Sequence, residues 1–497
     1  MKKIILLSIV VILILGGAAG TYWWISRPQV IKFSDDTTLT LLGADYGKRH
    51  TVPGGKLPPA TARPATQGRG AVVQTARTFT TAADTLVVWL RAKSDQSSDT
   101  PNQNHSFQFF IYDKAGTACG QAYANFQQGV RVSSVQFPAF PRRQGQLYLR
   151  VQEQGNGGQE MAEEKFVINN PAAGKSFAKW TPEPMPTTKE DDGLSVTLTK
   201  LLAGAALPYQ RVQDDPDDVI NKGAQVAFRV ERGGKPVTDW EPVSVETTDA
   251  TGNRTAINYG AGNNQSKWNG GEATLTLQNG LWPDEPAWKV RMEMTQTSDF
   301  SSDEQWAAQN IPVVPGSQQG FNGMAGVGRR GGPGATAVTT PPATPTPCAE
   351  ADLGGRHIKV FPAVLFTNQP ARPAGLPANA VYNQPQQTAF MIQVQPAIVN
   401  YNGMRSGTVG GVNGAQTPDD GMRLSLVKVT DGQGGEFPQS YNYSPVPTST
   451  GTGADSISTF RYTLRDTGDV TNLNLTIALH KDRFFEFTAK PEKASAE

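Results

Sequence analysis

Apolar and polar residues alternate in many short runs along this 497-residue chain. Leu194, Val196 and Leu198 alternate with serine and threonine, and Trp288 and Val290 begin a similar run with charged residues between them. A period of two indicates strands with one face on a core and the other in water. The pattern therefore predicts a mainly β protein with two or three antiparallel β-sandwich domains of immunoglobulin-like type.

Stretches rich in proline and glycine separate these runs into three blocks, because such residues interrupt regular elements. The predicted organisation is a first sandwich over residues 28–171, a proline-rich linker over 172–188, a second sandwich over 189–314, a flexible Gly/Pro/Thr-rich linker over 315–347 and a third, sandwich-like domain over 348–497. Near the end of the third block, the alternating run 473–479 and the run 484–487 lie three to four residues apart, which predicts a hairpin.

The three blocks resemble repeats of one unit. In each block an Asp-x-x-Gly turn follows a strand-like run, and a later closing run ends at a proline. The turns begin at Asp113, Asp249 and Asp431, and the prolines are Pro171, Pro312 and Pro491. Similar spacing favours duplication, although Asp and Gly are common in turns of any origin. Whether the third block is a true copy of the first two stays open.

The N-terminus has a different character from the rest of the chain. The 22 residues from Ile4 to Ile25 carry no charge, with Lys2 and Lys3 before them and Arg27 behind. A helix of this length crosses a hydrocarbon layer of about 30 Å. The lysines favour a cytoplasmic N-terminus, so residues from 28 onward are expected outside the cytoplasm.

Residues 1–27 also fit a second interpretation, a secretory signal peptide cleaved within the small residues 16–20. Both interpretations export the rest of the chain. We expect a bacterial-type single-pass protein of the cell membrane, inserted through residues 4–25, with its bulk periplasmic or extracellular.

Composition restricts the partners of the protein. The 45 basic and 44 acidic residues leave a net charge of +1, which excludes the strong field of a nucleic-acid-binding protein. Cys119 and Cys348, the only cysteines, fall in different blocks. Whether they pair stays open, because a disulfide requires a geometry that sequence does not reveal.

An acidic cluster is the candidate metal site. Asp214, Asp215, Asp217 and Asp218 bring several carboxylates into one segment, which is the ligand type that Ca²⁺ prefers. The alternative is a solvated acidic loop without an ion. The four histidines lack the close spacing of a zinc site, and His480 is expected to be exposed at the end of a strand.

Trp268 is the candidate ligand-binding residue. Asparagine, glutamine and glycine flank it, which predicts a polar loop where an aromatic ring would contact a carbohydrate or a peptide. No nucleophile elbow occurs in the sequence. The Gly-x-Gly-x-x-Gly match at residues 326–331 lies in the flexible linker, without the strand and helix that a dinucleotide site requires.

These observations predict a membrane-anchored, extracytoplasmic structural or interaction protein, without catalytic activity or cofactor, that binds an unidentified protein or glycan and no nucleic acid. One alternative is a carbohydrate- or peptide-binding module displayed on the cell envelope. A second is a secreted hydrolase, which would need paired carboxylates in a cleft. The oligomeric state stays open.

Overall fold

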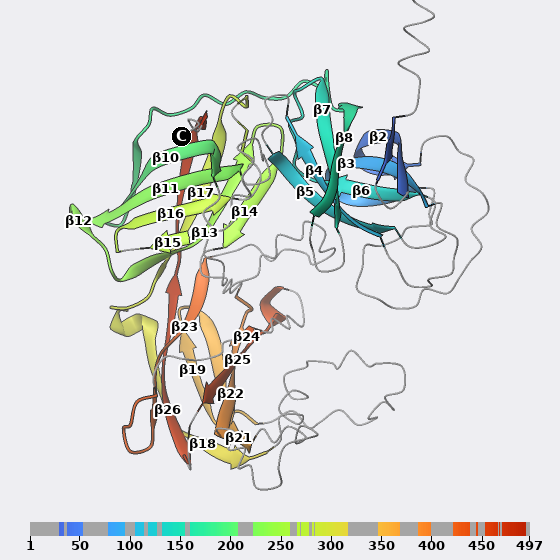
Figure 1. The fold of residues 1–497 in the computed structure, drawn as a ribbon. Coiled ribbons are helices and arrows are strands. Elements are labelled where there is room, and N and C mark those ends of the chain that lie inside the picture. The colour runs from blue at the N-terminus through green and yellow to red at the C-terminus, as the bar shows by residue number, and fades with distance from the viewer. Residues whose placement is uncertain are drawn as a thin grey trace, which may run out of the picture.

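A computed structural model describes most of the chain beyond the N-terminal segment (Figure 1). The described residues are 29–33, 37–52, 78–94, 105–113, 118–126, 132–154, 160–206, 222–258, 266–268, 270–277, 281–282, 284–316, 346–367, 386–398, 421–437, 444–445, 453–465, 467 and 470–493. The predicted membrane segment, residues 4–25, lies outside these ranges. Within them, no helix combines the length and apolar character needed to cross a bilayer.

The prediction of a mainly β protein with antiparallel sheets is confirmed. Among the described residues the only helical elements are two 3₁₀ turns, η2 (Ser302–Glu304) and η3 (Gly453–Asp455). Two short parallel pairings, β10 with β28 and β18 with β21, are the exceptions to antiparallel order in this part of the chain.

Strands β1 to β8 form two four-stranded sheets, which we call the first sheet pair. One sheet has the order β1-β2-β3-β6, formed by Val30–Lys32, Thr37–Thr51, Thr78–Ser94 and Ser133–Phe137. The other has the order β5-β4-β7-β8, formed by Ala118–Phe126, His105–Tyr112, Gln146–Gln154 and Glu160–Asn169.

The second sheet pair consists of β9 to β17 together with the last two strands of the chain. Its larger sheet has the order β15-β16-β11-β10-β28, with β12 and β9 attached: Ser266–Trp268, Glu272–Leu277, Lys222–Arg232, Leu194–Ala206, Glu492–Lys493, Lys235–Pro236 and Thr187–Asp191. Its smaller sheet has the order β14-β13-β17-β27: Arg254–Asn258, Trp240–Asp249, Trp288–Gln296 and Arg483–Ala489.

Strands β18 to β26 form one continuous sheet whose two halves pack on a shared core. We call these two halves the third sheet pair. The main order is β19-β20-β22-β21-β18-β26-β23, formed by Ala349–Leu353, Arg356–Val360, Gln386–Gln395, Ala363–Thr367, Gln305–Pro315, Asn472–Lys481 and Met422–Asp431. Strand β25 (Ser458–Arg465) pairs with β22, and β24 (Ser444–Pro445) pairs with β25. Apolar residues of β20, β22 and β25 share one core with those of β18, β23 and β26.

The second and third sheet pairs exchange their closing strands. After β17, the chain leaves the second pair and enters the third as β18, antiparallel to β26 and then parallel to β21. After β26, it returns to the second pair as β27, antiparallel to β17, and ends as β28, parallel to β10. Figure 1 shows this return as one long red path from the lower sheets into the upper ones. Each of these two pairs is therefore completed by a strand from the other's part of the sequence.

The exchange contradicts one expectation from the sequence. Residues 473–479 and 484–487 lie in β26 and β27, which pair with strands of different sheet pairs and not with each other as a hairpin. Only Asp482 separates these two strands, so the chain continues without reversing. The predicted domain boundaries remain a prediction, but the strand pairing crosses the boundary between residues 189–314 and 348–497 in both directions.

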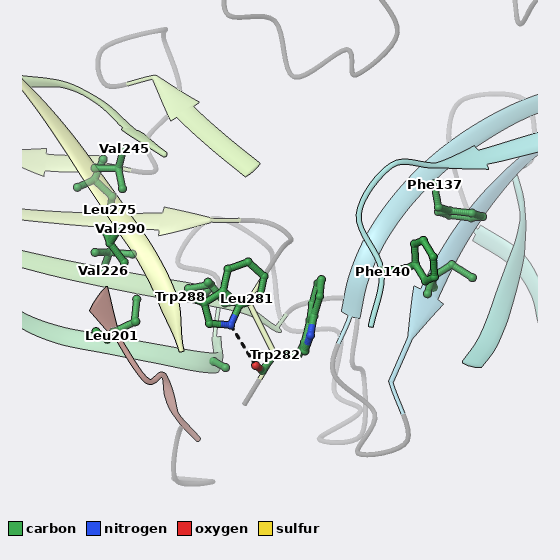
Figure 2. Packing of buried hydrophobic residues seen from close by; sticks show 14 of the residues in the cluster. Phe137, Phe140, Leu201, Val226, Val245, Leu275, Leu281, Trp282, Trp288 and Val290 are labelled. Atoms are coloured by element: carbon green, nitrogen blue, oxygen red, sulfur yellow. Dashed lines mark hydrogen bonds between the residues drawn. The ribbon is translucent and has the colours of Figure 1, made fainter. Parts of the chain in front are cut away.

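The predicted inward-facing residues form the cores. Leu194, Val196, Leu198, Trp288 and Val290 are all fully buried, as the period of two requires. They belong to a continuous core that also includes residues of the first sheet pair, with Trp282 on the side of Trp288 that faces Phe140 (Figure 2). The first and second sheet pairs therefore bury a common apolar interior.

Two of the predicted Asp-x-x-Gly turns have the same hydrogen-bond pattern. Asp249 Oδ1 accepts from the backbone N–H groups of Thr251 and Asn253, both at 2.9 Å. Asp431 Oδ1 accepts from the equivalent N–H groups two and four residues later, at 2.8 and 2.7 Å. In both turns the carboxylate stabilises an otherwise open turn, and the internal repeat itself stays a prediction.

Candidate functional site: two polar junctions

Buried polar side chains gather at two junctions between sheet pairs. The first junction lies between the first and second pairs, where the segment before β7 meets the turn after β13 and the segment before β17. The second lies between the second and third pairs, where β17 and β23 meet the crossing from β26 to β27. Burial of so many polar groups costs free energy unless they bond to each other, so both junctions are specific structures.

The turn after β13 presents Asn253 to the first sheet pair. Gly252 has φ of +92° and its N–H donates to the Asp249 carbonyl at 3.1 Å, which closes the turn. Asn253 Nδ2 donates to Asp249 Oδ2 at 2.7 Å, which fixes the amide. The turn chemistry thus orients a side chain that reaches across the first junction.

Asn253 pairs with the backbone of Phe140 in both directions. Its Nδ2 donates to the Phe140 carbonyl at 3.0 Å, and its Oδ1 accepts from the Phe140 N–H at 3.1 Å. Both residues are fully buried. The pair of bonds imitates one step of an antiparallel ladder and ties the two sheet pairs together without a strand.

Arg142 supports the same contact. Its guanidinium donates to the carbonyl of Thr251 in the second sheet pair and to that of Asp84 in the first, the latter at 3.2 Å. Its guanidinium carbon lies 5.2 Å from the ring centroid of Tyr46 and 5.5 Å from that of Phe140. Since Arg142 is 5% exposed, its charge is satisfied by carbonyls and aromatic faces.

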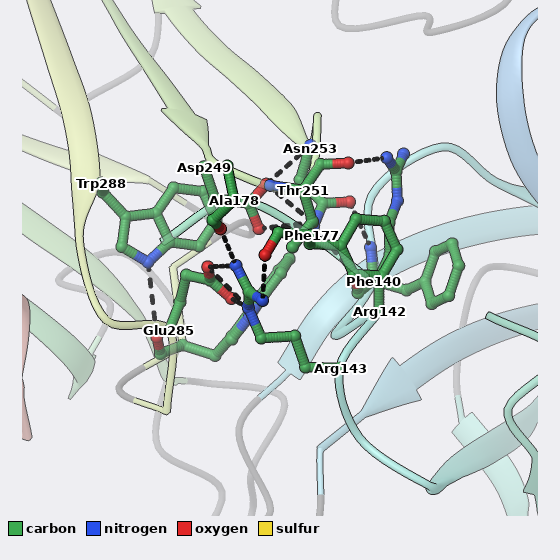
Figure 3. Close-up of polar contacts among 11 residues, drawn as sticks. Phe140, Arg142, Arg143, Phe177, Ala178, Asp249, Thr251, Asn253, Glu285 and Trp288 are labelled. Atoms are coloured by element: carbon green, nitrogen blue, oxygen red, sulfur yellow. Dashed lines mark hydrogen bonds and ion pairs between the residues drawn. The ribbon is translucent and has the colours of Figure 1, made fainter. Parts of the chain in front are cut away.

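Arg143 forms a forked ion pair with Glu285 (Figure 3). Its Nε lies 3.0 Å from both carboxylate oxygens of Glu285, and its Nη2 lies 3.0 Å from Oε1. Arg143 also donates to the carbonyls of Phe177 and Ala178 in the segment that connects the two sheet pairs. Burial raises the pKa of Glu285, and the hydrogen bonds from Arg143 oppose that rise.

The second junction contains a buried network centred on Arg423 of β23. Its Nη2 donates to Glu293 Oε1 of β17 at 3.0 Å, and its Nε donates to Asp482 Oδ2 at 2.7 Å. Ser244 of β13 donates to Glu293 Oε2 at 2.5 Å. Arg423, Glu293 and Asp482 are each less than 5% exposed. One guanidinium of the third sheet pair therefore bonds a carboxylate of the second pair and the residue at the strand crossing.

His480 lies beside this network and corrects the expectation of an exposed ring. It is 1% exposed, its Nε2 lies 2.9 Å from Ser425 Oγ, and its ring packs against Phe300 with centroids 4.9 Å apart. Burial and the nearby Arg423 lower the pKa of His480 to about 3. Alternation in β26 does not predict this burial, because Phe300, which packs on the ring, comes from the distant segment before β18.

Strand β27 is also fixed at the surface. Arg483 donates to the carbonyl of Asp191 at 2.6 Å and to Asp192 Oδ2 at 2.6 Å, and it lies over the ring of Trp240. Lys289 and Glu486 form an exposed ion pair at 2.8 Å between β17 and β27. These contacts hold the exchanged strand in register.

The first sheet pair contains a smaller polar group that sequence analysis missed. His50 is fully buried, with Nδ1 2.7 Å from Asp45 Oδ1 and Nε2 3.2 Å from Thr81 Oγ1. The Thr81 hydroxyl also lies 2.8 Å from the Ala83 carbonyl, which is a second acceptor for its proton. The arrangement ties β2 to β3.

Trp268, the one described residue among those proposed from the sequence, does not belong to the polar contacts of either junction. Trp268 lies in strand β15, partly buried against the shared core, so the prediction of a polar loop is wrong for this residue, while its ligand role stays a prediction. Asp214, Asp215, Asp217 and Asp218 lie outside the described residues. Within the described ranges, no three His, Cys, Asp or Glu side chains form a group suited to a metal. Cys348 has a free, exposed thiol.

No family model matches this chain, and no curated protein is significantly similar to it. The geometry of the junctions therefore provides the evidence for function. Their residues hold sheets together, and neither junction combines an exposed nucleophile with a base.

Proposed function

We propose that this protein is a membrane-anchored, extracytoplasmic structural or interaction protein. In this proposal residues 4–25 cross the membrane, the N-terminus is cytoplasmic, and three immunoglobulin-like sandwiches form one stiff body that holds the third sheet pair away from the membrane. The partner would be a protein or a glycan at the cell envelope. The observation that carries the proposal is the reciprocal exchange of β18 and β27 between the second and third sheet pairs.

The strand order supports the immunoglobulin-like part of the proposal. In the second sheet pair the order β10-β11-β16-β15 corresponds to strands A-B-E-D of such a sandwich, and β14-β13-β17-β27 corresponds to C′-C-F-G. The first pair has the matching orders β2-β3-β6 and β5-β4-β7-β8. In the third pair β23-β26-β18 corresponds to C-F-G, with β18 supplied from before the block.

Stiffness follows from how the sheet pairs are connected. A flexible linker permits independent motion, whereas here β26 and β27 are separated by one residue, and Asp482 is buried in the second junction. The first junction adds the Asn253–Phe140 and Arg143–Glu285 contacts. A body of this kind suits a spacer or a display platform better than an enzyme that opens and closes.

Distance measurements between spin labels test the stiffness. Glu164 of the first sheet pair and Gln433 of the third are both exposed, so E164C and Q433C labels would report on the whole body in a background with Cys119→Ser and Cys348→Ser. We expect one narrow distance distribution. A control pair of labels within the first sheet pair gives the width of a rigid reference. A distribution several times broader than the reference would contradict the proposal.

Fractionation tests the anchor separately. We expect the full-length chain in the membrane fraction, with its C-terminal part digested by protease added outside the cytoplasmic membrane. An N-terminus near residue 21 together with release into the soluble fraction would show a cleaved signal peptide instead, and would leave the stiffness measurement unaffected.

A further inference from the structure

The second junction contains more acidic than basic groups. The charged or titratable groups that face it are Glu241 of β13, Glu293 of β17, Arg423 of β23, His480 of β26 and Asp482 at the crossing. Glu241 is exposed on β13, and Arg483 at the start of β27 is directed away to Asp191 and Asp192. The buried interior thus holds one guanidinium, two carboxyl groups and one imidazole.

Charge balance requires a proton in this interior. Arg423 neutralises one carboxylate, and a second uncompensated charge among buried groups would be strongly unfavourable. Glu293 already has a hydrogen-bond donor on each of its two oxygens, Ser244 on Oε2 and Arg423 on Oε1. Asp482 Oδ1 and His480 Nδ1, by contrast, are buried atoms of this interior that still lack a partner among the described residues, so a proton placed between them would serve both.

The geometry indicates which group holds it. Asp482 Oδ1 and His480 Nδ1 lie 4.0 Å apart, and neither atom has a hydrogen-bond partner in the described part of the chain. A proton on Asp482 Oδ1 would give each atom a partner after a shift of about 1 Å or through one water molecule. His480 would then accept at Nδ1 and donate from Nε2 to Ser425 Oγ, 2.9 Å away. A protonated His480 would instead place a second cation beside Arg423.

We propose that the Asp482–His480 pair binds one proton in the folded protein, on Asp482, and that this proton keeps the junction of the second and third sheet pairs equally stable across mildly acidic to neutral pH. In the unfolded chain the same proton resides on the histidine. Folding transfers it from the imidazole to the carboxyl group, without net uptake or release.

Titration of Asp482 and titration of His480 change the folding stability in opposite directions as pH rises. Burial raises the pKa of Asp482 from 3.8 to about 7, against the influence of Arg423, so the stability from this group is complete below 3.8 and is lost as pH rises through about 7. Burial lowers the pKa of His480 from 6.5 to about 3, so the stability from that group is complete above 6.5 and is lost as pH falls towards 3. Between about pH 4 and 6.5 folded and unfolded pairs each hold one proton, and the slopes cancel.

A variant that removes one member of the pair should reveal the pH dependence of stability that the other member causes. In Asp482→Asn, the denaturant midpoint of the second and third sheet pairs should fall as pH is lowered from 6.5 to 4.5. In His480→Gln, it should fall as pH is raised over the same range. In the wild-type chain and in the double variant, the denaturant midpoint should not change with pH. Asp192→Asn, in an exposed ion pair of the same crossing, is the matched control. Slopes of the same sign in both single variants would overturn the proposal.

Magnetic resonance tests the proton directly in the unmodified full-length chain. The sequence has four histidines, so ¹⁵N-histidine labelling gives few signals, and His480 is assigned by its absence from the glutamine variant. At pH 5 we expect His480 to show the two distinct nitrogen shifts of a neutral ring protonated at Nε2. The two similar shifts of an imidazolium at pH 5 would overturn the proposal.

Discussion

The first sheet pair obtains its closing strand differently from the second and third sheet pairs. In the first pair β8 follows β7 in the sequence and pairs with it. In the other two, the closing strands β27 and β18 each come from beyond the boundary of their own block. A sheet pair can therefore be closed locally or by exchange, and only exchange makes two sheet pairs dependent on each other for completion.

Local and exchanged closing strands also differ in what covers their outer hydrogen-bonding edge. Val167 of β8 is 37% exposed, and the Gln29 side chain bonds both its N–H and its carbonyl, at 2.8 and 2.7 Å. Strand β18 instead pairs with β21 on its second side, and the Thr488 carbonyl of β27 accepts from the backbone N–H of Glu183 at 2.6 Å. A side chain protects the free edge in the first pair, while backbone of the same chain covers it in the others.

The sequence predicts the strands well because burial of one face is a local property. The alternation over β10 and β17 identifies the inward residues, and the Asp249 and Asp431 turns are visible as motifs. The closing runs before Pro312 and Pro491 are also visible as strands. Their partners are not, because both runs present similar apolar faces and either could complete either core.

The polar junctions could not be predicted for the same reason. Glu293 alternates with apolar residues in β17 and is expected in water, but it is 4% exposed because Arg423 of another block covers it. His480 is covered in the same way by Phe300, from the segment before β18. A periodic pattern describes the faces of one strand, and it contains no information about which outer faces a neighbouring sandwich covers.

Removing the exchanged strand should have the largest effect. A chain ending at Lys481 lacks β27 and β28, and with them the buried Phe485, Phe487 and Ala489. We expect the second sheet pair to unfold, since losing two buried aromatic residues alone costs more than about 5 kcal/mol. Limited proteolysis should cleave within residues 187–296 and spare the first sheet pair.

A chain lacking only residues 494–497 is the control for this deletion, because those residues follow the last strand. If the deletion to Lys481 instead exposed the third sheet pair to protease and left the second intact, the final strand would complete its own block and the exchange would be wrong.

A smaller and local change distinguishes the two kinds of closing strand. Phe487 of β27 is fully buried, with its ring 5.8 Å from that of Phe228, and Phe166 of β8 is fully buried in the first pair. Either substitution to alanine should cost about 3–5 kcal/mol. Phe166→Ala should destabilise the first sheet pair alone, whereas Phe487→Ala should destabilise the second and third together.

Hydrogen exchange followed by mass spectrometry resolves the sheet pairs and measures this difference. Glu486→Gln is the matched control in β27, because its ion pair with Lys289 is exposed and should contribute about 0–1 kcal/mol. Faster exchange confined to the second pair in Phe487→Ala would show that the two exchanged pairs unfold independently.

The smallest expected effect concerns the first junction, which joins the locally closed pair to the exchanged ones. Asn253→Ala removes the two bonds to Phe140 and leaves its buried N–H and carbonyl without these partners, at a cost of about 1–3 kcal/mol. The shared core around Trp282 remains, so we expect both sheet pairs to stay folded while the Phe140 amide exchanges faster. Arg254→Gln, which breaks a half-exposed ion pair one residue away, should leave that amide unchanged. Equal exchange of the Phe140 amide in wild type and Asn253→Ala would mean that apolar packing alone fixes the junction, and that the turn after β13 contributes no specificity to it.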